Sequence, residues 1–248
     1  MSPPSDEPRE QLLNAAGEIF AERGFAGTTI RDICGRAGAN VAAVNYYFRD
    51  KHGLYIEAVK RAHCSPVLLD FNALTTASTA QKLHLFVTGM LTHLLDDSRP
   101  SWHARLMMRE LAEPTEACTA LVESYIRPQA LELEKILRGV VPAQTRAEFY
   151  MFGFSIVSQC LFYRVQRPIA ELLVGPAEYT VYTVPKLAAH ITHFSLLGLG
   201  LSPDFAPLPF PPPGVPLQIA DPGAIGALPA ALSPAPSAAH PAPGEVPR

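Results

Sequence analysis

The sequence lacks the short motifs that mark the common enzyme classes. It has no GxxxxGK[ST] phosphate-binding loop, no HExxH zinc motif and no recognisable Ser–His–Asp set. Its four cysteines form no CxxC pair, which argues against a zinc ribbon or a thioredoxin-like site, and dispersed thiols fit a reducing compartment. We therefore expect a protein that is not an enzyme and that uses no cofactor or metal.

Long hydrophobic runs and a secretory signal are also absent. The two longest apolar stretches, residues 149–163 and 187–201, have 15 residues each, whereas a membrane-spanning helix needs about 20. Residues 1–10 are polar and lack the apolar centre of a signal peptide. We expect a cytoplasmic protein with no membrane partner, in which both stretches are buried helices.

Positive charge is scarce but unevenly distributed. The formal net charge of the 248 residues is −3, which excludes a basic protein that coats nucleic acid without specificity. Residues 31–61 carry six Lys or Arg against three Asp or Glu, whereas residues 1–23 carry two against five. A locally basic segment of this kind is compatible with a small DNA-binding module.

The sequence pattern predicts an all-α fold, because no segment alternates apolar and polar residues between hairpin turns. Residues 203–248 hold 14 of the 25 prolines and only four charged residues, which predicts a disordered or polyproline-like tail. We expect a three-helix domain over residues 1–62, a helical domain over residues 63–202 and the tail over residues 203–248. For Pro211–Pro213, a peptide-ligand role is the alternative to an extension without a function.

The first sixty residues predict a helix-turn-helix. Thr29 and Asp32 have the spacing of a capping box, Gly38 suits the end of that helix, and Asn40 suits the cap of the next. Two short helices joined by a glycine-containing turn form this motif. The second of them, residues 41–47, carries alanines, an asparagine and two tyrosines but no charge, a composition that suits contact with base edges and phosphates.

The same residues resemble a known family. The N-terminal domain of the TetR family of bacterial transcriptional regulators is similar, without gaps, to the run LLNAAGEIFAERGFAGTTIRDICGRAGANVAAVNYYFRDKHGLYIEAVKR. The subgroup called CerR-type or CecR-type is similar to GANVAAVNYYF and, further on, to RLMMRELAEPTEA and SQCLFYRVQRP. The resemblance implies a homodimeric regulator, in our expectation a repressor, that binds a palindromic operator in double-stranded DNA and responds to a small-molecule effector.

The resemblance also implies which residues contact DNA. Thr29 and Arg31 would touch phosphate or a base edge, Lys51 would bind phosphate, and Asn40 would cap the recognition helix. The residues that would reach the major groove or its phosphates are Val41, Ala42, Ala43, Asn45, Tyr46 and Tyr47. Helical geometry also allows Val41 to lie in the core beside Val44.

Residues 63–200 are expected to form five or six helices, the last two at about 146–165 and 177–199. In the resembled family two such helices from each subunit form the dimer interface, and the helix at about 51–62 links the domains. The candidates for an effector site are Trp102, Met107, Met108, Arg109, Glu110, Gln159, Phe162, Tyr163 and Arg164. An internal ion pair or a solvent face is the alternative for Arg109 and Glu110, and core packing is the alternative for the methionines and aromatic residues.

Other functions stay open at this stage. An activator of the same family would have the same sequence features, a helical enzyme would need a catalytic pair that we do not find, and a protein-interaction module would use the tail. If the tail has no such role, deleting residues 203–248 should leave operator binding unchanged. His190 and His193 lack a third ligand for a metal, and Cys160 is expected to be a buried thiol rather than a redox sensor.

Overall fold

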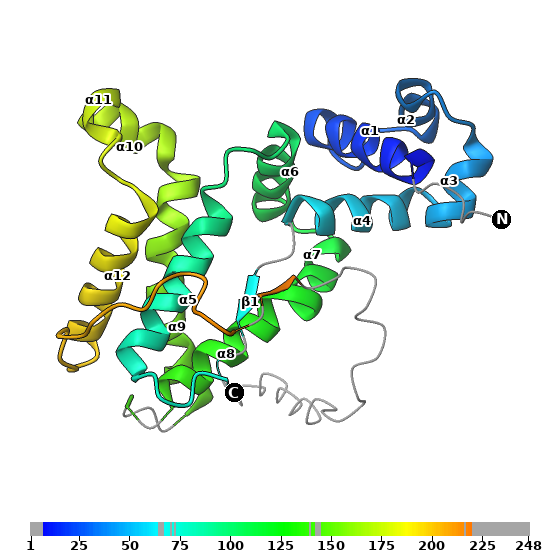
Figure 1. Ribbon diagram of the computed structural model, residues 1–248. Coiled ribbons are helices and arrows are strands. Elements are labelled where there is room, and N and C mark those ends of the chain that lie inside the picture. The colour runs from blue at the N-terminus through cyan, green and yellow to red at the C-terminus, as the bar shows by residue number, and fades with distance from the viewer. Residues whose placement is uncertain are drawn as a thin grey trace, which may run out of the picture.

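The computed structural model describes residues 7–63, 67–69, 71, 73–138, 140–141, 145–215 and 217–219 of the chain. These residues form two groups of helices joined side by side (Figure 1), and the predicted all-α fold is confirmed. The helices are α1 (Glu7–Arg23), α2 (Ile30–Ala37), α3 (Val41–Phe48), α4 (Lys51–His63), α5 (Thr79–Leu94), α6 (Ser101–Ala112), α7 (Glu116–Leu121), α8 (Arg127–Leu137), α9 (Arg146–Val165), α10 (Arg167–Val174), α11 (Pro176–Tyr179) and α12 (Val184–Gly198). A π-helical turn, Val122–Ile126, joins α7 to α8. Within the described residues, none of these helices combines the length and the hydropathy that crossing a membrane would require.

The first hydrophobic core lies between α1, α4 and α6. Leu12 and Phe20 of α1 and Leu54 of α4 are fully buried there, as the apolar spacing of both helices predicts. Trp102 and Leu106 of α6 enter the same core. The core therefore extends past residue 62, where the sequence analysis places the end of the first domain.

The second hydrophobic core lies around α5, which packs along α12 and also contacts α8 and α9. Leu83 and Leu91 of α5, Leu137 of α8, Ile156 of α9 and Ile191 of α12 are all buried in it. These helices form the group drawn beside the first core in Figure 1. The second core thus belongs entirely to the expected regulatory region and its C-terminal extension.

The predicted helix at 177–199 is wrong over its first turns. The chain instead forms the single turn α11, leaves the helix over residues 180–183, and begins α12 at Val184. Pro185 favours this new start, because proline is tolerated in the first turn of a helix, where its missing N–H has no partner to lose. The described residues also contain more helices after residue 63 than the five or six predicted.

The tail, expected to be disordered or polyproline-like, is ordered over residues 203–215 and 217–219 and ends there in a short strand. Strand β2 (Leu217–Ile219) pairs antiparallel with β1 (Val67–Leu69), in the linker that follows α4, with Val67 opposite Ile219. The half-buried side chains that attach the tail to the second core are Phe205, Leu208, Phe210 and Val215. Proline does not prevent this packing, because an extended chain needs few backbone donors. Residues 220–248 lie outside the described part.

Candidate nucleic-acid interface

The end of the first domain that carries α2 and α3 is shaped by local hydrogen bonds. Thr29 caps α2: its hydroxyl accepts a bond from the Asp32 amide at 3.2 Å, and its own amide donates to Asp32 Oδ2 at 3.1 Å. Hydrogen bonds from the Thr29 hydroxyl and amide lower the pKa of Asp32, so this carboxylate stays charged. Gly38 ends α2 with a φ of 63°, as glycine permits. The predicted capping box and helix end are confirmed.

The recognition helix predicted from the sequence is α3. Asn40 caps it, with Oδ1 accepting from the Ala43 amide at 2.8 Å, and Val44 and Phe48 anchor it in the first core. Because these two side chains face inward, the opposite face of α3 is turned to solvent. Val41 is 44% exposed and Tyr46 is 79% exposed, so Val41 belongs to the open face and not to the core.

The predicted DNA-binding surface comprises ten residues, of which seven are exposed and three are half-buried. The exposed members are Thr29, Arg31, Asn40, Val41, Ala42, Asn45 and Tyr46, and the half-buried members are Ala43, Tyr47 and Lys51. They come from the start of α2, from α3 with its cap, and from the start of α4. The Lys51 ammonium lies 4.4 Å from the centre of the Phe25 ring, which holds this side chain near the surface by a cation–π contact.

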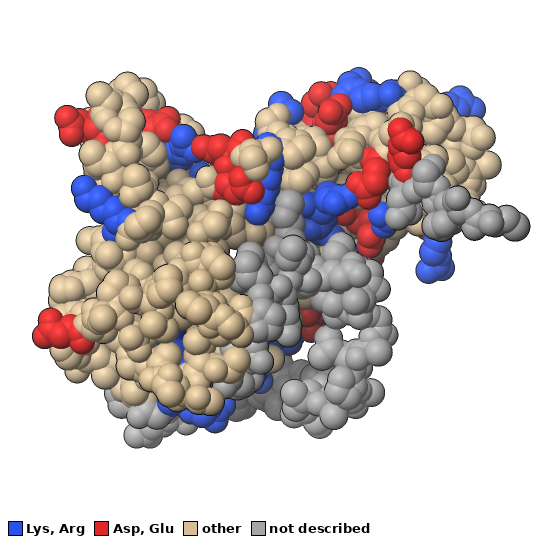
Figure 2. Space-filling model, in the orientation of Figure 1, with Lys and Arg blue, Asp and Glu red and all other residues tan. Residues whose placement is uncertain are grey.

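Charged side chains of both signs lie at the rim of this surface. Figure 2 shows an uncharged area at the α3 end of the molecule, with Lys and Arg side chains above and below it and Asp and Glu side chains on the side toward the rest of the molecule. Small uncharged side chains permit close approach to base edges, and cations beside them can contact phosphates. One rim residue, Arg49 in the turn after α3, is absent from the sequence-predicted set. Its signal was a basic residue directly after the aromatic triplet.

The residues predicted to line one effector site lie in two separate places. Trp102 and Met107 pack in or against the first core, and Glu110, 1% exposed, accepts hydrogen bonds from the Tyr55 hydroxyl and from the Thr115 amide, both at 2.7 Å. Glu110 therefore holds α4 and the start of α7 together. Met108 is exposed on α6, and Arg109 Nη2 donates to the Glu22 carbonyl at 3.4 Å.

The other effector candidates lie on α9. Gln159 Nε2 donates to Ser195 of α12 at 3.3 Å, Phe162 is 48% exposed, and Arg164 pairs with Asp97 at 3.6 Å. Tyr163 packs against the second core. The structure therefore does not bring the α6 and α9 candidates into one cavity.

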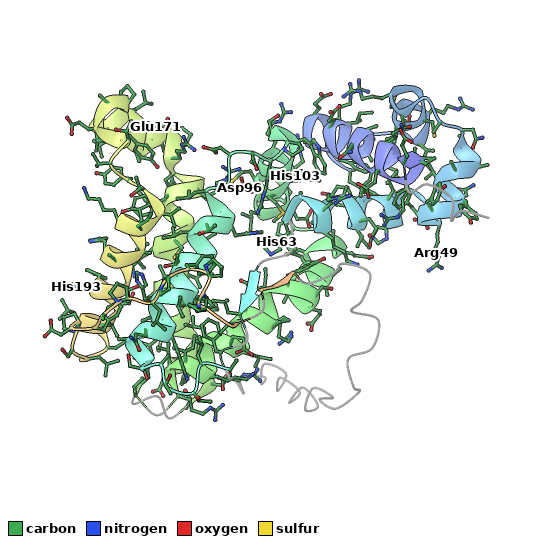
Figure 3. All side chains as sticks on the ribbon, viewed as in Figure 1. Arg49, His63, Asp96, His103, Glu171 and His193 are labelled. Carbon is green, nitrogen blue, oxygen red and sulfur yellow. The ribbon has the colours of Figure 1, made fainter. Side chains whose placement is uncertain are left out.

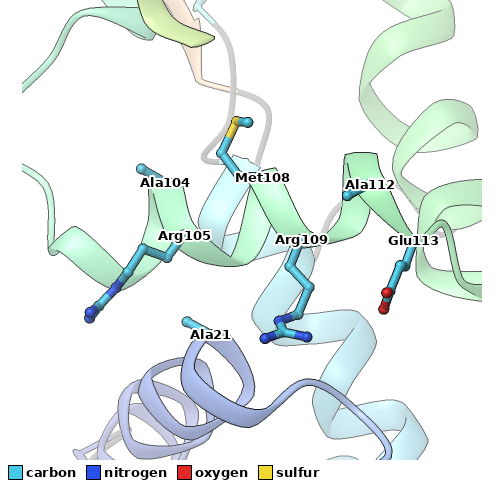
Figure 4. Close-up of a pocket in the computed structure, with 7 residues that line it drawn as sticks. All are labelled: Ala21, Ala104, Arg105, Met108, Arg109, Ala112 and Glu113. Atoms are coloured by element: carbon cyan, nitrogen blue, oxygen red, sulfur yellow. The ribbon is translucent and has the colours of Figure 1, made fainter. Parts of the chain in front are cut away.

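Two hollows in the described part of the molecule bear on the question of an effector site. The larger is an open groove of about 490 Å³ between α1 and α6 (Figure 4), lined by Ala21, Ala104, Arg105, Met108, Arg109, Ala112 and Glu113. The smaller is an apolar cavity of about 110 Å³ between α5, α8 and α9, with Phe86, Leu133 and Phe149 among its walls. Of the predicted effector residues, only Met108 and Arg109 line either one.

An uncharged apolar face is exposed along α9 and α12. Met151, Phe154 and Phe162 of α9 and Phe194 and Leu197 of α12 are between 48% and 64% exposed. The ionisable Arg and Glu side chains of α9 lie at its two ends, so the middle of the helix presents apolar and small polar groups to solvent. A contiguous face of this kind is typical of a protein–protein contact.

The remaining candidates are two histidines and a cysteine. Among the described residues, no three His, Cys, Asp or Glu side chains are grouped as a metal site would require. His190 and His193 are exposed on α12. Cys160 is fully buried, and burial raises the pKa of its thiol to about 12, so the expectation of a protonated, buried thiol is confirmed.

Comparison with known proteins gives two family matches. Residues 12–58 match the family "Bacterial regulatory proteins, tetR family", and residues 79–199 match "HTH-type transcriptional dual regulator CecR, C-terminal domain". The probable regulator YttP of Bacillus subtilis is 23% identical over 132 residues, which are 52% of this chain and 62% of YttP. The regulator BetI of Escherichia coli is 39% identical over 85 residues, 33% of this chain and 43% of BetI. The chain thus spans less than two thirds of the length of either curated relative.

Solved structures show the same fold. HlyIIR, a haemolysin II transcriptional regulator, superposes with a TM-score of 0.52 at 24% identity, over 75% of this chain and 98% of that one. FadR from Bacillus subtilis, in complex with stearoyl-CoA, superposes with a TM-score of 0.51 at 17% identity, over 77% of this chain and 98% of that one. At these identities the likeness is one of fold alone.

Proposed function

We propose that this chain, which belongs to the TetR family of bacterial regulatory proteins and carries a C-terminal domain of the CecR type, is a cytoplasmic homodimeric repressor that binds a palindromic operator and releases it on binding an effector. The family consists of DNA-binding regulators of transcription and not of enzymes. The observation that carries the proposal is α3, a capped helix whose inner side is held by Val44 and Phe48 and whose outer face is open and uncharged.

Each face residue has a role that its chemistry supports. Asn45 is exposed in the middle of α3, where its amide can bond an adenine edge bidentately, and Ala42 can contact a thymine methyl. The Tyr46 and Tyr47 hydroxyls can donate to phosphates, and Lys51 can bind one as a cation. In this proposal α3 supplies base recognition, and the starts of α2 and α4 supply backbone contacts.

The apolar face of α9 and α12 supports a homodimer. A second copy that covers this face would remove large apolar side chains from water and would place two α3 helices on one duplex. Two half-sites one helical turn apart require recognition helices separated by about 34–36 Å. The dimer is therefore the part of the proposal that accounts for a palindromic operator.

The route of regulation follows from the packing of α6. This helix lies in the regulatory region but packs on both α1 and α4, so a shift of α6 would move the first core and with it α3. We place the effector, an apolar small molecule, at the cavity between α5, α8 and α9, which holds about 110 Å³ in this structure and would have to widen to the roughly 300 Å³ or more of a typical ligand site. Linkage requires that effector and operator weaken each other's binding by the same factor, which equilibrium titration measures.

The DNA-binding face is tested by exchanging one side chain. We expect the purified protein to protect a palindrome in the DNA that flanks its own gene, and Asn45→Ala to change base preference at one position per half-site by about 1–3 kcal/mol. Asn14→Ala, the same change at an exposed position of α1, is the control. If Asn45→Ala leaves both affinity and selected sequence as they were, the assigned orientation of α3 is wrong.

The dimer face is tested separately. Phe194→Asp, on α12, should give a monomer in sedimentation and weaken operator binding at least a hundredfold, because a single α3 contacts only one half-site. Leu111→Asp makes the same kind of change at a residue of α6 that is 57% exposed, and should leave both measurements unchanged. A Phe194→Asp protein that remains a dimer would place the subunit interface elsewhere.

A further inference from the structure

Arg49 occupies a backbone conformation that disfavours its own side chain. It follows α3 with a φ of 72° and a ψ of −48°, and among the described residues it is the one non-glycine residue with positive φ. A positive φ with a negative ψ is sparsely populated by L-residues and costs roughly 1–3 kcal/mol, most of which glycine avoids. The turn alone would therefore favour glycine at this position.

The fold does not use the Arg49 side chain. Its backbone amide closes α3 by donating to the Asn45 carbonyl at 3.2 Å, a bond that any residue except proline would make. Within the described part of the chain the guanidinium makes no hydrogen bond or ion pair, and Figure 3 shows it projecting away from the helices. By contrast, Arg36 pairs with Glu18 and Glu22.

The neighbours of Arg49 in the same turn have structural partners. Asp50 Oδ1 accepts a hydrogen bond from the Gly53 amide at 2.8 Å and so caps α4. Lys51 lies over the ring of Phe25. Among residues 49–51, Arg49 is thus the cation that is exposed and has no side-chain partner. It caps the C-terminal end of α3, one helical turn beyond Asn45.

We propose that Arg49 is a phosphate-binding residue that positions α3: its guanidinium binds the DNA backbone where the C-terminal end of the helix leaves the major groove. This inference rests on the proposed function and adds a residue to its site. Arginine suits the role because its planar fork bonds phosphate bidentately and stays charged at any physiological pH. Strain that persists at an exposed residue without a structural partner is typical of a functional position.

The experiment measures affinity, salt dependence and stability together, on the full chain. Arg49→Gln removes the charge and keeps much of the length, Arg49→Lys keeps the charge without the fork, and Arg49→Gly removes the side chain and the strain. Arg138→Gln, the same loss of charge at an exposed residue after α8, is the control for net charge. The probes are a duplex selected by the wild-type protein and an unrelated duplex of equal length, titrated at several salt concentrations.

We expect Arg49→Gln and Arg49→Gly to bind both duplexes about tenfold more weakly, with a slope of log K against log salt that is shallower by about 0.9 per protomer. Arg49→Lys should keep the slope and recover part of the affinity. Arg49→Gly should unfold at a temperature no lower than the wild type, which separates lost contact from lost fold.

Two results would overturn the inference. One is a salt slope and affinity for Arg49→Gln equal to those of the wild type and of Arg138→Gln. The other is a loss confined to the selected duplex, which would indicate base recognition and not phosphate binding. If instead the wild-type protein binds no duplex even at low salt, both the proposed function and this inference are wrong, so the two failures are distinguishable.

Discussion

The two hydrophobic cores are each completed by a segment from a distant part of the sequence, but the two segments differ in kind. The first core, built on α1 and α4, is completed by α6, which supplies Trp102 and Leu106. The second core, built on α5, α8, α9 and α12, is covered by the tail, which supplies Phe205 and Phe210. The helix α6 lies within the CecR-type match, whereas the tail lies beyond its end at residue 199.

Because of this difference, we expect α6 to couple the regulatory region to the DNA-binding helices, and the tail to support only the stability of the second core. Because α6 belongs to the regulatory region and is buried in the DNA-binding core, any change in its position must be shared by the helices that hold α3. The described residues of the tail, 203–215 and 217–219, contact α5 and the linker at 67–69, and they pack in the second core, away from the first core that holds α3. We therefore expect damage to α6 to affect both stability and DNA binding, and loss of the tail to affect stability alone.

The largest effect is expected from Trp102→Ala. The indole is 3% exposed and lies against Gly17 of α1, so closely that a Cβ on Gly17 would stand 2.4 Å from its Cζ3 atom. Removing a buried tryptophan costs about 3–5 kcal/mol, because a cavity is left where apolar surface was buried. The free energy of unfolding from urea titration, followed by circular dichroism, should fall by this amount, and operator affinity should fall with it.

Gly17→Ala tests the same contact from the other side. Alanine favours a helix over glycine by about 1 kcal/mol, but here its methyl group would overlap the indole, so the variant should be destabilised. In the Gly17→Ala/Trp102→Ala double variant the overlap is gone. Its loss of unfolding free energy should therefore be smaller than the sum of the losses of the two single variants. Strict additivity would show that α1 and α6 do not meet through these residues.

Truncation of the tail is expected to have the next largest effect. A chain that ends at residue 202 exposes the patch on α5 that Phe205, Leu208 and Phe210 cover, and loses the bond from Gln81 Nε2 to the Ala206 carbonyl at 2.9 Å. Three half-buried apolar side chains contribute about 2–3 kcal/mol in all. A chain that ends at residue 219 keeps these contacts and is the control. Below their unfolding temperatures, both should bind the operator as the full chain does; weaker binding by the shorter chain would contradict the division between coupling and support.

The N-terminal helices were predictable because their ends are determined by residues that lie close together in the sequence. Thr29 with Asp32, Gly38 and Asn40 each act on a backbone group within four residues, so spacing alone identifies them. The burial of the Val44 side chain could be predicted from the same helical spacing. The positive φ of Arg49 could not be predicted in this way, because arginine gives no signal of positive φ.

The regulatory region was less predictable because its contacts are distant in sequence. The packing of the apolar residues of the tail could not be predicted, because the many prolines around them indicate an unfolded segment. These residues nevertheless contact α5, which lies more than a hundred residues earlier in the chain. Glu110 resembled a ligand contact because it lies in an apolar pattern, whereas its partners Tyr55 and Thr115 come from two other elements. A single sequence does not identify such partners.

The smallest expected effect concerns the histidines at the junction of the two cores. His93 at the end of α5 is 2.7 Å through Nε2 from the carbonyl of His63 at the end of α4, and Arg99 donates to its Nδ1 at 2.9 Å. This geometry requires a neutral His93 that donates through Nε2. Burial, with the neighbouring His93 and Arg99, lowers the pKa of His63 to about 4, and burial, with Arg99, does the same for His93.

Because these pKa values lie below the ordinary value near 6.5, the unfolded chain binds more protons than the folded one. The stabilisation is complete above about pH 6.5 and is lost as the pH falls toward 4, by about 1.4 kcal/mol per pH unit for each histidine. Urea titrations at pH 7.5 and 5.5 should show this loss, and His93→Gln, which cannot be protonated, should reduce it by the share of one histidine. His190→Gln changes an exposed histidine and should leave the pH dependence intact. Equal pH dependence in all three proteins would mean that the contact between α4 and α5 does not depend on a neutral His93.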